Sequence, residues 1–198
     1  MIKNIVFDLA GVVFDRNDNT CPREIIEFFN FVHTGEPLPK FWNDYDRGIV
    51  EAEAVALQLA ELRKCDMPTV KRMMLSAIEY QDEIPETRNL IIELKQAGYH
   101  LFVLSNMSKD YIDHLRRQEV YKYFEGDVVS CETHTTKPER EIYETLLERF
   151  GLNADETLFM DDRPENVEAA IACGIHGFHF LRLNPAESCR QLRELLLK

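Results

Sequence analysis

Short apolar runs alternate with amphipathic segments along most of this chain, and polar turns separate them. The alternation is typical of β-α-β units, in which parallel strands form a buried sheet and helices cover its faces. It is regular from residue 86 to the end. The sequence therefore predicts an α/β fold, with strands expected in the segments KNIVFDL from Lys3, HLFVLS from His100, DVVS from Asp127, TLFMD from Thr157 and GFHFL from Gly177.

Three amphipathic segments that lie between these strands carry residues favoured at helix ends. TRNLIIELKQAG ends at Gly98 and PEREIYETLLERFG ends at Gly151, and glycine readily adopts the left-handed backbone that terminates a helix. PENVEAAIACG begins with Pro164, which suits the first turn of a helix, and ends at Gly174. We expect all three segments to be helices that pack on the sheet.

The segment from residue 15 to residue 85 breaks this rhythm because it reads as helices only: EIIEFFNFV, PKFWNDYDRG, EAEAVALQLAELRK and MPTVKRMMLSAIEY. In an open parallel sheet, ligands bind beyond the carboxyl ends of the strands, and an insertion that leaves the first strand there would cover the site. We therefore expect a core formed by residues 1–14 and 86–198 and an inserted all-helical cap formed by residues 15–85. The alternative is that these helices only pad one face of the sheet.

Composition limits the partners of the chain. Its 198 residues can bury the core of one domain with a modest insertion. The formal net charge is -12 and no cluster of basic residues appears, so neither nucleic acid nor an anionic membrane is an expected partner, and no apolar segment is long enough to span a bilayer. Five scattered cysteines without a C-x-x-C spacing fit reduced thiols in a cytoplasm. A small molecule is the expected partner; the sequence leaves the oligomeric state open.

Polar groups occur at four expected strand ends. Taken singly, each has a plain structural explanation, such as a helix cap, a turn or a solvated lysine. If the strands are parallel, however, all of them converge at one edge of the sheet and combine carboxylates, a hydroxyl, an amide and an ammonium group. This set suits phosphoryl transfer, in which donors and a metal must offset the charge of the phosphoryl oxygens. The residues are Asp8, Ser105, Asn106, Lys137, Asp161 and Asp162.

These segments, in this order, resemble the four motifs of the haloacid dehalogenase-like (HAD) superfamily, and the resemblance covers essentially the whole chain. FDLAGVVFD is similar to the first motif, VLSN to the second, KPE to the third and FMDD to the fourth. The resemblance implies a Rossmann-like core with a five-stranded parallel sheet, and the helical insertion resembles the C1-type cap of the family. The first motif looks closest to that of the sugar-phosphate (glucose-1-phosphate-type) phosphatases, which read D-L-G there.

The resemblance also implies a nucleophile and a metal site. Asp8 would attack phosphorus and form an aspartyl-phosphate that water later hydrolyses. Mg²⁺ would be held by one oxygen of Asp8, by Asp162, by Asp161 directly or through water, and by the backbone carbonyl of Ala10. The activity implied is therefore that of a magnesium-dependent phosphatase acting on a small phosphomonoester, such as a sugar phosphate.

Other residues of the motifs would bind the phosphoryl group or hold the site together. The hydroxyl of Ser105 and the amide of Asn106 would donate hydrogen bonds to phosphoryl oxygens, with Asn106 acting through its side chain or mainly through its backbone. Lys137 would neutralise charge and orient the nucleophile. Asn166 would orient the acidic loop through local hydrogen bonds, and the alternative is direct contact with the metal.

One position departs from the pattern of the family. In most of its phosphatases, the residue two after the nucleophile is an aspartate that protonates the leaving oxygen and then activates water, but this chain has Ala10. General acid-base help is typically worth about 10²–10⁴-fold in rate. Its loss predicts either a slow enzyme or a substrate whose leaving group needs little protonation.

Two other functions fit parts of the pattern. A 2-haloacid dehalogenase also lacks the second aspartate, but it displaces halide from carbon without a metal and has no use for adjacent carboxylates such as Asp161 and Asp162. A phosphate-binding or regulatory protein without turnover would not need Asp8 and Lys137 together with that acidic pair. These residues favour the phosphatase.

In the expected cap, Arg47 and Gly48 mark a break between two helical stretches. Arg47 is a candidate for binding a second anionic or hydroxyl-rich part of the substrate, and the alternative is a solvated arginine. Trp42 and Tyr45 are expected to pack inside the cap, and the alternative is that they line an aromatic wall of the site.

Overall fold

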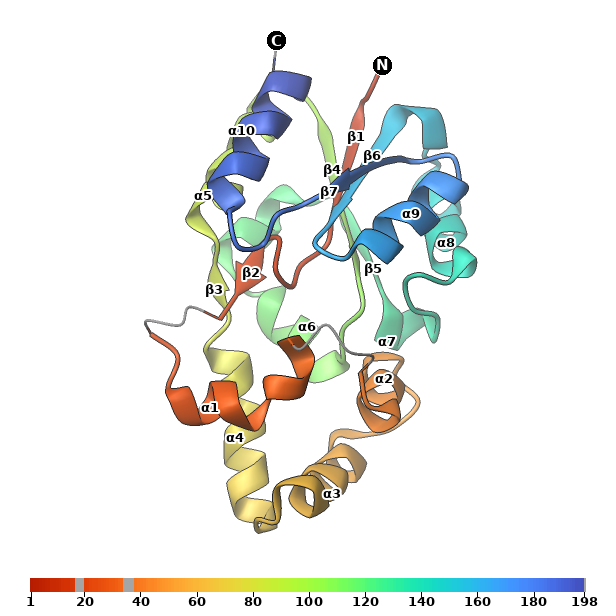
Figure 1. Cartoon of the computed structure of the whole chain (residues 1–198). Helices are drawn as coiled ribbons and strands as arrows, with labels where there is room; N and C mark the ends of the chain where they lie inside the picture. Colours follow the sequence, from red (N-terminus) through yellow and green to blue (C-terminus); the bar gives the residue numbers. More distant parts are fainter. Residues whose placement is uncertain (17–19, 34–37, 198) are drawn as a thin grey trace.

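The structure is a computed structural model that describes residues 1–16, 20–33 and 38–197. Its main sheet has five strands in the order β5-β4-β1-β6-β7, and every neighbouring pair is parallel (Figure 1). The predicted α/β class with a five-stranded parallel sheet is confirmed. The strands are β1 Asn4–Phe7, β4 His100–Ser105, β5 Gly126–Val129, β6 Thr157–Asp161 and β7 His176–His179.

The central strand β1 is buried along its whole length. Because side chains alternate across a sheet, Ile5 and Phe7 pack into the larger hydrophobic cluster on one face, while Val6 packs into a second cluster on the other face. In the register of the sheet, Phe7 lies between Val103 of β4 and Met160 of β6. The three strands therefore end at the same edge.

Helices cover both faces of the sheet, as the alternating sequence predicts. Helices α5 and α10 pack against each other on one side, whereas α8 and α9 pack together on the other side (Figure 1). Short helices α6 and α7 follow β4 and β5. Within the described residues, no helix is both long and apolar enough to cross a membrane. The bounds are α5 Pro85–Gln96, α6 Lys109–Leu115, α7 Ser130–Thr133, α8 Arg140–Phe150, α9 Pro164–Ala172 and α10 Pro185–Leu196.

A second group of helices forms a helical cap region beyond the carboxyl ends of the strands, on the side of the molecule opposite the two termini (Figure 1). Trp42 and Tyr45 are buried there, and Phe29 contacts the Trp42 ring at a centroid distance of 5.7 Å. The helices are α1 Arg23–Phe28, the 3-10 helix Asn30–His33, α2 Lys40–Asp46, α3 Ala52–Arg63 and α4 Met67–Glu79.

The predicted insertion is not helical throughout. Strands β2 (Phe14–Asp15) and β3 (Asp82–Glu83) form an antiparallel ribbon where the chain leaves the core and returns to it. The expectation of helices only was wrong at these positions, because strands of two residues carry no periodic pattern that a sequence can show. The ribbon holds the two crossings side by side.

Candidate active site

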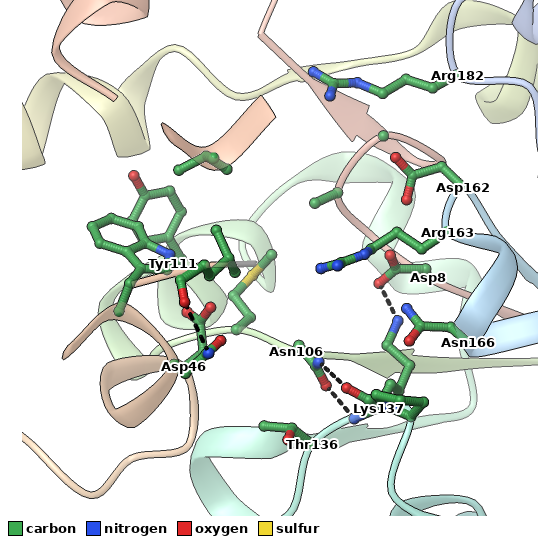
Figure 2. Close-up of a pocket in the computed structure, with 18 of the residues that line it drawn as sticks. Asp8, Asp46, Asn106, Tyr111, Thr136, Lys137, Asp162, Arg163, Asn166 and Arg182 are labelled. Atoms are coloured by element: carbon green, nitrogen blue, oxygen red, sulfur yellow. Dashed lines mark hydrogen bonds and ion pairs between the residues drawn. The ribbon is translucent and has the colours of Figure 1, made fainter. Parts of the chain in front are cut away.

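A cavity of about 380 Å³ lies between the carboxyl edge of the sheet and the cap region, and residues from both parts line it (Figure 2). This volume falls in the range of small-molecule sites. The core contributes Asp8, Ala10, Asn106, Lys137 and Asp162 to the lining, and the cap region contributes Trp42, Asn43, Asp46 and Arg47.

Three carboxylates meet at the core end of this cavity. Asp8 directly follows β1, Asp161 ends β6, and Asp162 comes next in the chain. Because β1 and β6 are parallel neighbours, one oxygen from each of the three carboxylates lies within 4.8 Å of the others. Such a concentration of negative charge in a buried place is costly unless protons or cations neutralise it.

A tight loop after β1 makes this approach possible. The carbonyl of Leu9 accepts hydrogen bonds from the backbone N–H groups of Val13 and Phe14, both 2.9 Å, and Gly11 has a φ of 77°. A Cβ atom on Gly11 would lie 2.7 Å from Oδ2 of Asp162, which is too close for any real side chain. Glycine is therefore favoured here by its backbone angle, and a side chain at this position would also force the carboxylate of Asp162 to shift.

Lys137 is the counter-charge of the cluster. Its Nζ lies 2.8 Å from Oδ1 of Asp8 and 2.6 Å from Oδ2 of Asp161, and all three side chains are almost fully buried. Oδ1 of Asp8 also accepts a 2.7 Å hydrogen bond from the backbone of Leu9. The described residues donate no hydrogen bond to the other oxygen, so Oδ2 of Asp8 is the oxygen available to a ligand.

The two other carboxylates differ in how they are held. Both oxygens of Asp161 accept hydrogen bonds, from Lys137, from the backbone of Arg163 and from the amide of Asn166 at 3.0 Å. Asn166 thus orients the acidic loop, in the way expected from the sequence. No described residue donates a hydrogen bond to the carboxylate of Asp162, which leaves its oxygens free to bind a cation.

The pKa values of Asp8 and Asp162 are raised, and burial is the main cause. Burial raises the pKa of Asp8 to about 6, although the charge of Lys137 opposes the shift. Burial, together with the charges of Asp8 and Asp161, raises the pKa of Asp162 to about 7. Burial lowers the pKa of Lys137, but the two carboxylates outweigh this and raise it. The excess negative charge suits a bound cation.

The donor set fits Mg²⁺ on chemical grounds. Mg²⁺ prefers oxygen ligands, and it is commonly held by one or two carboxylates with water and substrate oxygens. Asp8 and Asp162 offer free carboxylate oxygens, and Ala10 lines the same cavity. Asp161, whose oxygens are already hydrogen-bonded, is better placed to support the site than to bind the ion alone.

Asn106 and Ser105 do not lie as a simple phosphate-binding pair. The side chain of Asn106 donates to the backbone carbonyl of Lys137 and accepts from its backbone N–H, both at 2.8 Å. The amide therefore fixes the loop of Lys137 through one of its two N–H groups, and Asn106 also lines the cavity, so its contact with a phosphoryl oxygen stays a prediction. Ser105 is fully buried, and its Oγ has no hydrogen-bond partner among the described residues.

Arg47 connects the cap region to the core. Its guanidinium forms an ion pair with Glu139, donates to Oγ1 of Thr136 at 2.8 Å and donates to the carbonyl of His134 at 3.2 Å. These acceptors flank the loop of Lys137. The positive charge expected to bind a second part of the substrate is thus already paired with a carboxylate, although Arg47 still lines the cavity.

Sequence reasoning missed several residues of the lining, namely Arg16, Asp46, Tyr111, Arg163 and Arg182. Arg182 pairs with Asp15 through two contacts of 2.6 Å at the base of the cap region. Arg16 follows Asp15 directly. The position of Arg16 at a crossing between core and cap was the available signal, because a site between two parts of a chain is lined by their crossings. Arg182 lies 167 positions from Asp15 and gave no such signal.

The sheet order and the carboxylate cluster at the strand ends are those of a Rossmann-like hydrolase core. The haloacid dehalogenase-like hydrolase family model matches residues 2–174, and this chain belongs to that family.

Curated relatives include both phosphatases and a dehalogenase. The chain is 27% identical over 200 residues to a sesquiterpene phosphatase of Aspergillus oryzae, which covers 98% of this chain and 96% of the relative. It is 25% identical over 192 residues to D-ribitol-5-phosphate phosphatase of Bacteroides thetaiotaomicron, with 90% and 91% covered. It is 26% identical over 145 residues to (S)-2-haloacid dehalogenase 4A of Burkholderia cepacia, with 73% and 59% covered.

Solved structures share the fold. A HAD family enzyme of Bacteroides thetaiotaomicron, in complex with magnesium and inorganic phosphate, has a TM-score of 0.72 and 23% identity, covering 90% of this chain and 94% of its own. A dehalogenase has a TM-score of 0.76 and 19% identity, covering 100% of this chain and 98% of its own. At such identities the likeness establishes the Rossmann-like fold and does not choose between the two activities.

Proposed function

We propose that this chain is a magnesium-dependent phosphatase that hydrolyses a small phosphomonoester, such as a sugar phosphate, through Asp8. The observation that carries the proposal is the position of Asp8, which pairs with Lys137 through one oxygen, keeps the other oxygen free, and has an oxygen within 4.8 Å of oxygens of Asp161 and Asp162. The names of the two phosphatase relatives, and the magnesium and phosphate bound by a structural neighbour, support the same activity.

The chemistry follows from how Asp8 is held. One carboxylate oxygen of Asp8 attacks phosphorus while the bond from phosphorus to the leaving oxygen breaks, which gives an aspartyl-phosphate and an alcohol or alkoxide. Water then attacks the phosphoryl group and releases phosphate, which restores the carboxylate. Lys137 fixes Oδ1 of Asp8 and offsets charge on the phosphoryl oxygens. Mg²⁺, when bound by Asp8, Asp162 and the Ala10 carbonyl, screens the phosphoryl charge and makes phosphorus accessible to an anion.

Release of phosphate from para-nitrophenyl phosphate, with and without Mg²⁺, tests this proposal. We expect release that needs the ion. A dehalogenase would instead free halide from a 2-haloacid without any metal, and without a cation the adjacent carboxylates Asp161 and Asp162 would repel that anionic substrate. A protein that binds phosphate but turns over no phosphomonoester would contradict the proposal and favour a regulatory role.

Magnesium binding should depend strongly on pH. Because the pKa values of Asp8 and Asp162 are raised, protonation of these two carboxyls stabilises the folded state. This stabilisation is fully present below the ordinary pKa of 3.8, and it is lost as the pH rises through the raised values of about 6 for Asp8 and about 7 for Asp162. Mg²⁺ competes with the same protons. We therefore expect the Mg²⁺-induced rise in melting temperature to be larger at about pH 8 than at about pH 5, and proton release on binding in calorimetry. Equal stabilisation at both pH values would contradict the assignment of these ligands.

The absence of an acid-base group at Ala10 determines how the rate of hydrolysis depends on the basicity of the leaving group. The residue is exposed and lines the cavity, so an aspartate there has room to approach the leaving oxygen. We expect wild-type rates to fall steeply as the leaving group becomes more basic, because an unprotonated leaving oxygen carries charge. Ala10→Asp should raise the rate for alkyl phosphates by about tenfold or more, which is part of the usual benefit of acid-base help.

A rate series over phosphomonoesters of graded leaving-group acidity, run for wild type and Ala10→Asp, checks this prediction. Ala10→Ser is the matched control, because it adds a polar side chain that is a very weak acid. A flat wild-type series without any gain from the aspartate would mean that another group already supplies the proton.

A further inference from the structure

Arg16 is a buried cation without a matching partner at the cap end of the cavity. Its side chain lines the cavity, yet Nε and Nη1 are buried and have no hydrogen-bond partner among the described residues. Nη2 donates to the hydroxyl of Tyr111 over a long 3.4 Å, and the guanidinium lies 5.3 Å from the centre of the buried Phe29 ring. Buried charged donors without acceptors are costly, so a ligand that supplies an acceptor is favoured here.

The nearby carboxylates of the described residues do not provide the missing negative charge. Asp15, the preceding residue, is paired with Arg182 through both of its oxygens. Asp46 lies close enough to raise the pKa of Tyr111, but burial raises the pKa of Asp46 itself well above its ordinary value and so favours its neutral form. The charge of Arg16 is therefore left for a group that enters the cavity.

Arg16 and Tyr111 together favour a ligand that accepts hydrogen bonds. Arginine offers only donors, and the oxygen of Tyr111 already accepts from Arg16, so the hydroxyl hydrogen of Tyr111 remains to be donated. Because the bond between the two side chains is long, the guanidinium can turn toward a better acceptor at little cost. The adjoining walls are apolar and come from Val32, Leu38, Trp42 and Met107. A carboxylate on a short apolar stem matches this combination of donors and walls.

The pair lies away from the phosphoryl end of the cavity. Figure 2 shows Tyr111 across the cavity from Asp8 and Lys137, with Asn106 between them. A substrate whose phosphoryl group meets Asp8 would place its other end toward Tyr111. We propose that Arg16 and Tyr111 form a second anion-binding subsite and that the substrate is a phosphorylated carboxylic acid, with its carboxylate on Arg16. This inference rests on the proposed phosphatase function, because that function fixes the phosphoryl end.

Binding of two matched probes tests the subsite without turnover. The probes are a straight-chain ω-phosphonooxy carboxylate and its carboxamide, which have the same length and shape but differ in charge. Calorimetry with the Asp8→Asn protein and Mg²⁺ should show about tenfold tighter binding of the carboxylate, the size expected for one charge-assisted hydrogen bond. Arg16→Met in the same background should bring the two dissociation constants together, and Arg16→Lys should keep part of the difference.

The matched control is Arg23→Met, which removes an arginine that is 89% exposed on helix α1 and should keep the full preference. Unchanged melting temperatures establish that each variant is folded. Equal affinities for the two probes, no affinity for either, or a preference that survives Arg16→Met would overturn the subsite. Phosphate release from the carboxamide by the wild-type protein decides the phosphatase function separately, because that probe does not need Arg16.

Discussion

Asp8→Asn is expected to lower the rate of phosphate release on the order of 10⁴-fold or more, because an amide is a poor nucleophile and a weaker ligand for Mg²⁺. The substitution preserves the size of the side chain, and the amide oxygen can still accept the hydrogen bond that Leu9 donates to Oδ1. The variant should therefore fold. The measurement is phosphate release by the purified variant at saturating Mg²⁺, together with its melting temperature.

Asp155→Asn is the control for this prediction. Asp155 is exposed and lies before β6, away from the residues that line the cavity, so its replacement should leave the rate within about twofold of wild type. Wild-type phosphate release by a folded Asp8→Asn protein would rule out Asp8 as the nucleophile.

Lys137→Met should harm both stability and activity. The substitution leaves the Asp8 and Asp161 carboxylates buried without their cation, and breaking a buried ion pair in this way typically costs about 3–5 kcal/mol. Loss of the ammonium group should also lower the rate by about 10²–10³-fold, as for other groups that stabilise charge in a transition state.

The loss of stability should depend on pH. Without Lys137, the pKa of Asp8 rises further, so the carboxyl is neutral at low pH and its charge becomes costly only as the pH increases. Urea unfolding at about pH 5 and about pH 8, without Mg²⁺, measures this difference, and the variant should lose more stability at the higher pH. An equal loss at both values would show that Lys137 stabilises the fold by packing rather than by charge.

Lys40→Met serves as the comparison for Lys137→Met. Lys40 has a side chain that is 87% exposed and pairs with Asp44 on the surface of helix α2. An exposed pair of this kind contributes about 0.3–0.5 kcal/mol, so the same chemical change should have little effect there.

The sequence predicts most of the sheet and the core half of the site, for physical reasons. The strands His100–Ser105 and Thr157–Asp161 appear with the predicted bounds because each is a continuous apolar run with polar neighbours. Parallel topology then brings the residues after these strands to one edge, which is why Asp8 and Asp161 could be expected to meet.

The cap half of the site could not be predicted in the same way, because it depends on contacts between distant parts of the chain. The partner of Arg47 is Glu139, 92 positions away, and even in the core half the side chain of Asn106 pairs with a backbone 31 positions away. Neither pairing leaves a periodic signal. Arg16 gains its importance only because the fold places it in the cavity beside Tyr111, 95 positions away.

It remains a prediction that the chain divides into two independent units, a core of residues 1–14 and 86–198 and a cap of residues 15–85. In the structure, one hydrophobic cluster includes Phe7 of the sheet together with Trp42 and Leu59 of the cap region. The cap region therefore shares packing with the core.

The central claim is that Asp8 receives the phosphoryl group, and its most direct test is to find that group on the protein. The wild-type enzyme is quenched with acid during turnover of para-nitrophenyl phosphate with Mg²⁺, and peptides are analysed by mass spectrometry. We predict one added phosphoryl group on Asp8, absent without Mg²⁺ and absent from Asp8→Asn. A phosphoryl group on any other side chain of the wild-type protein would contradict the account.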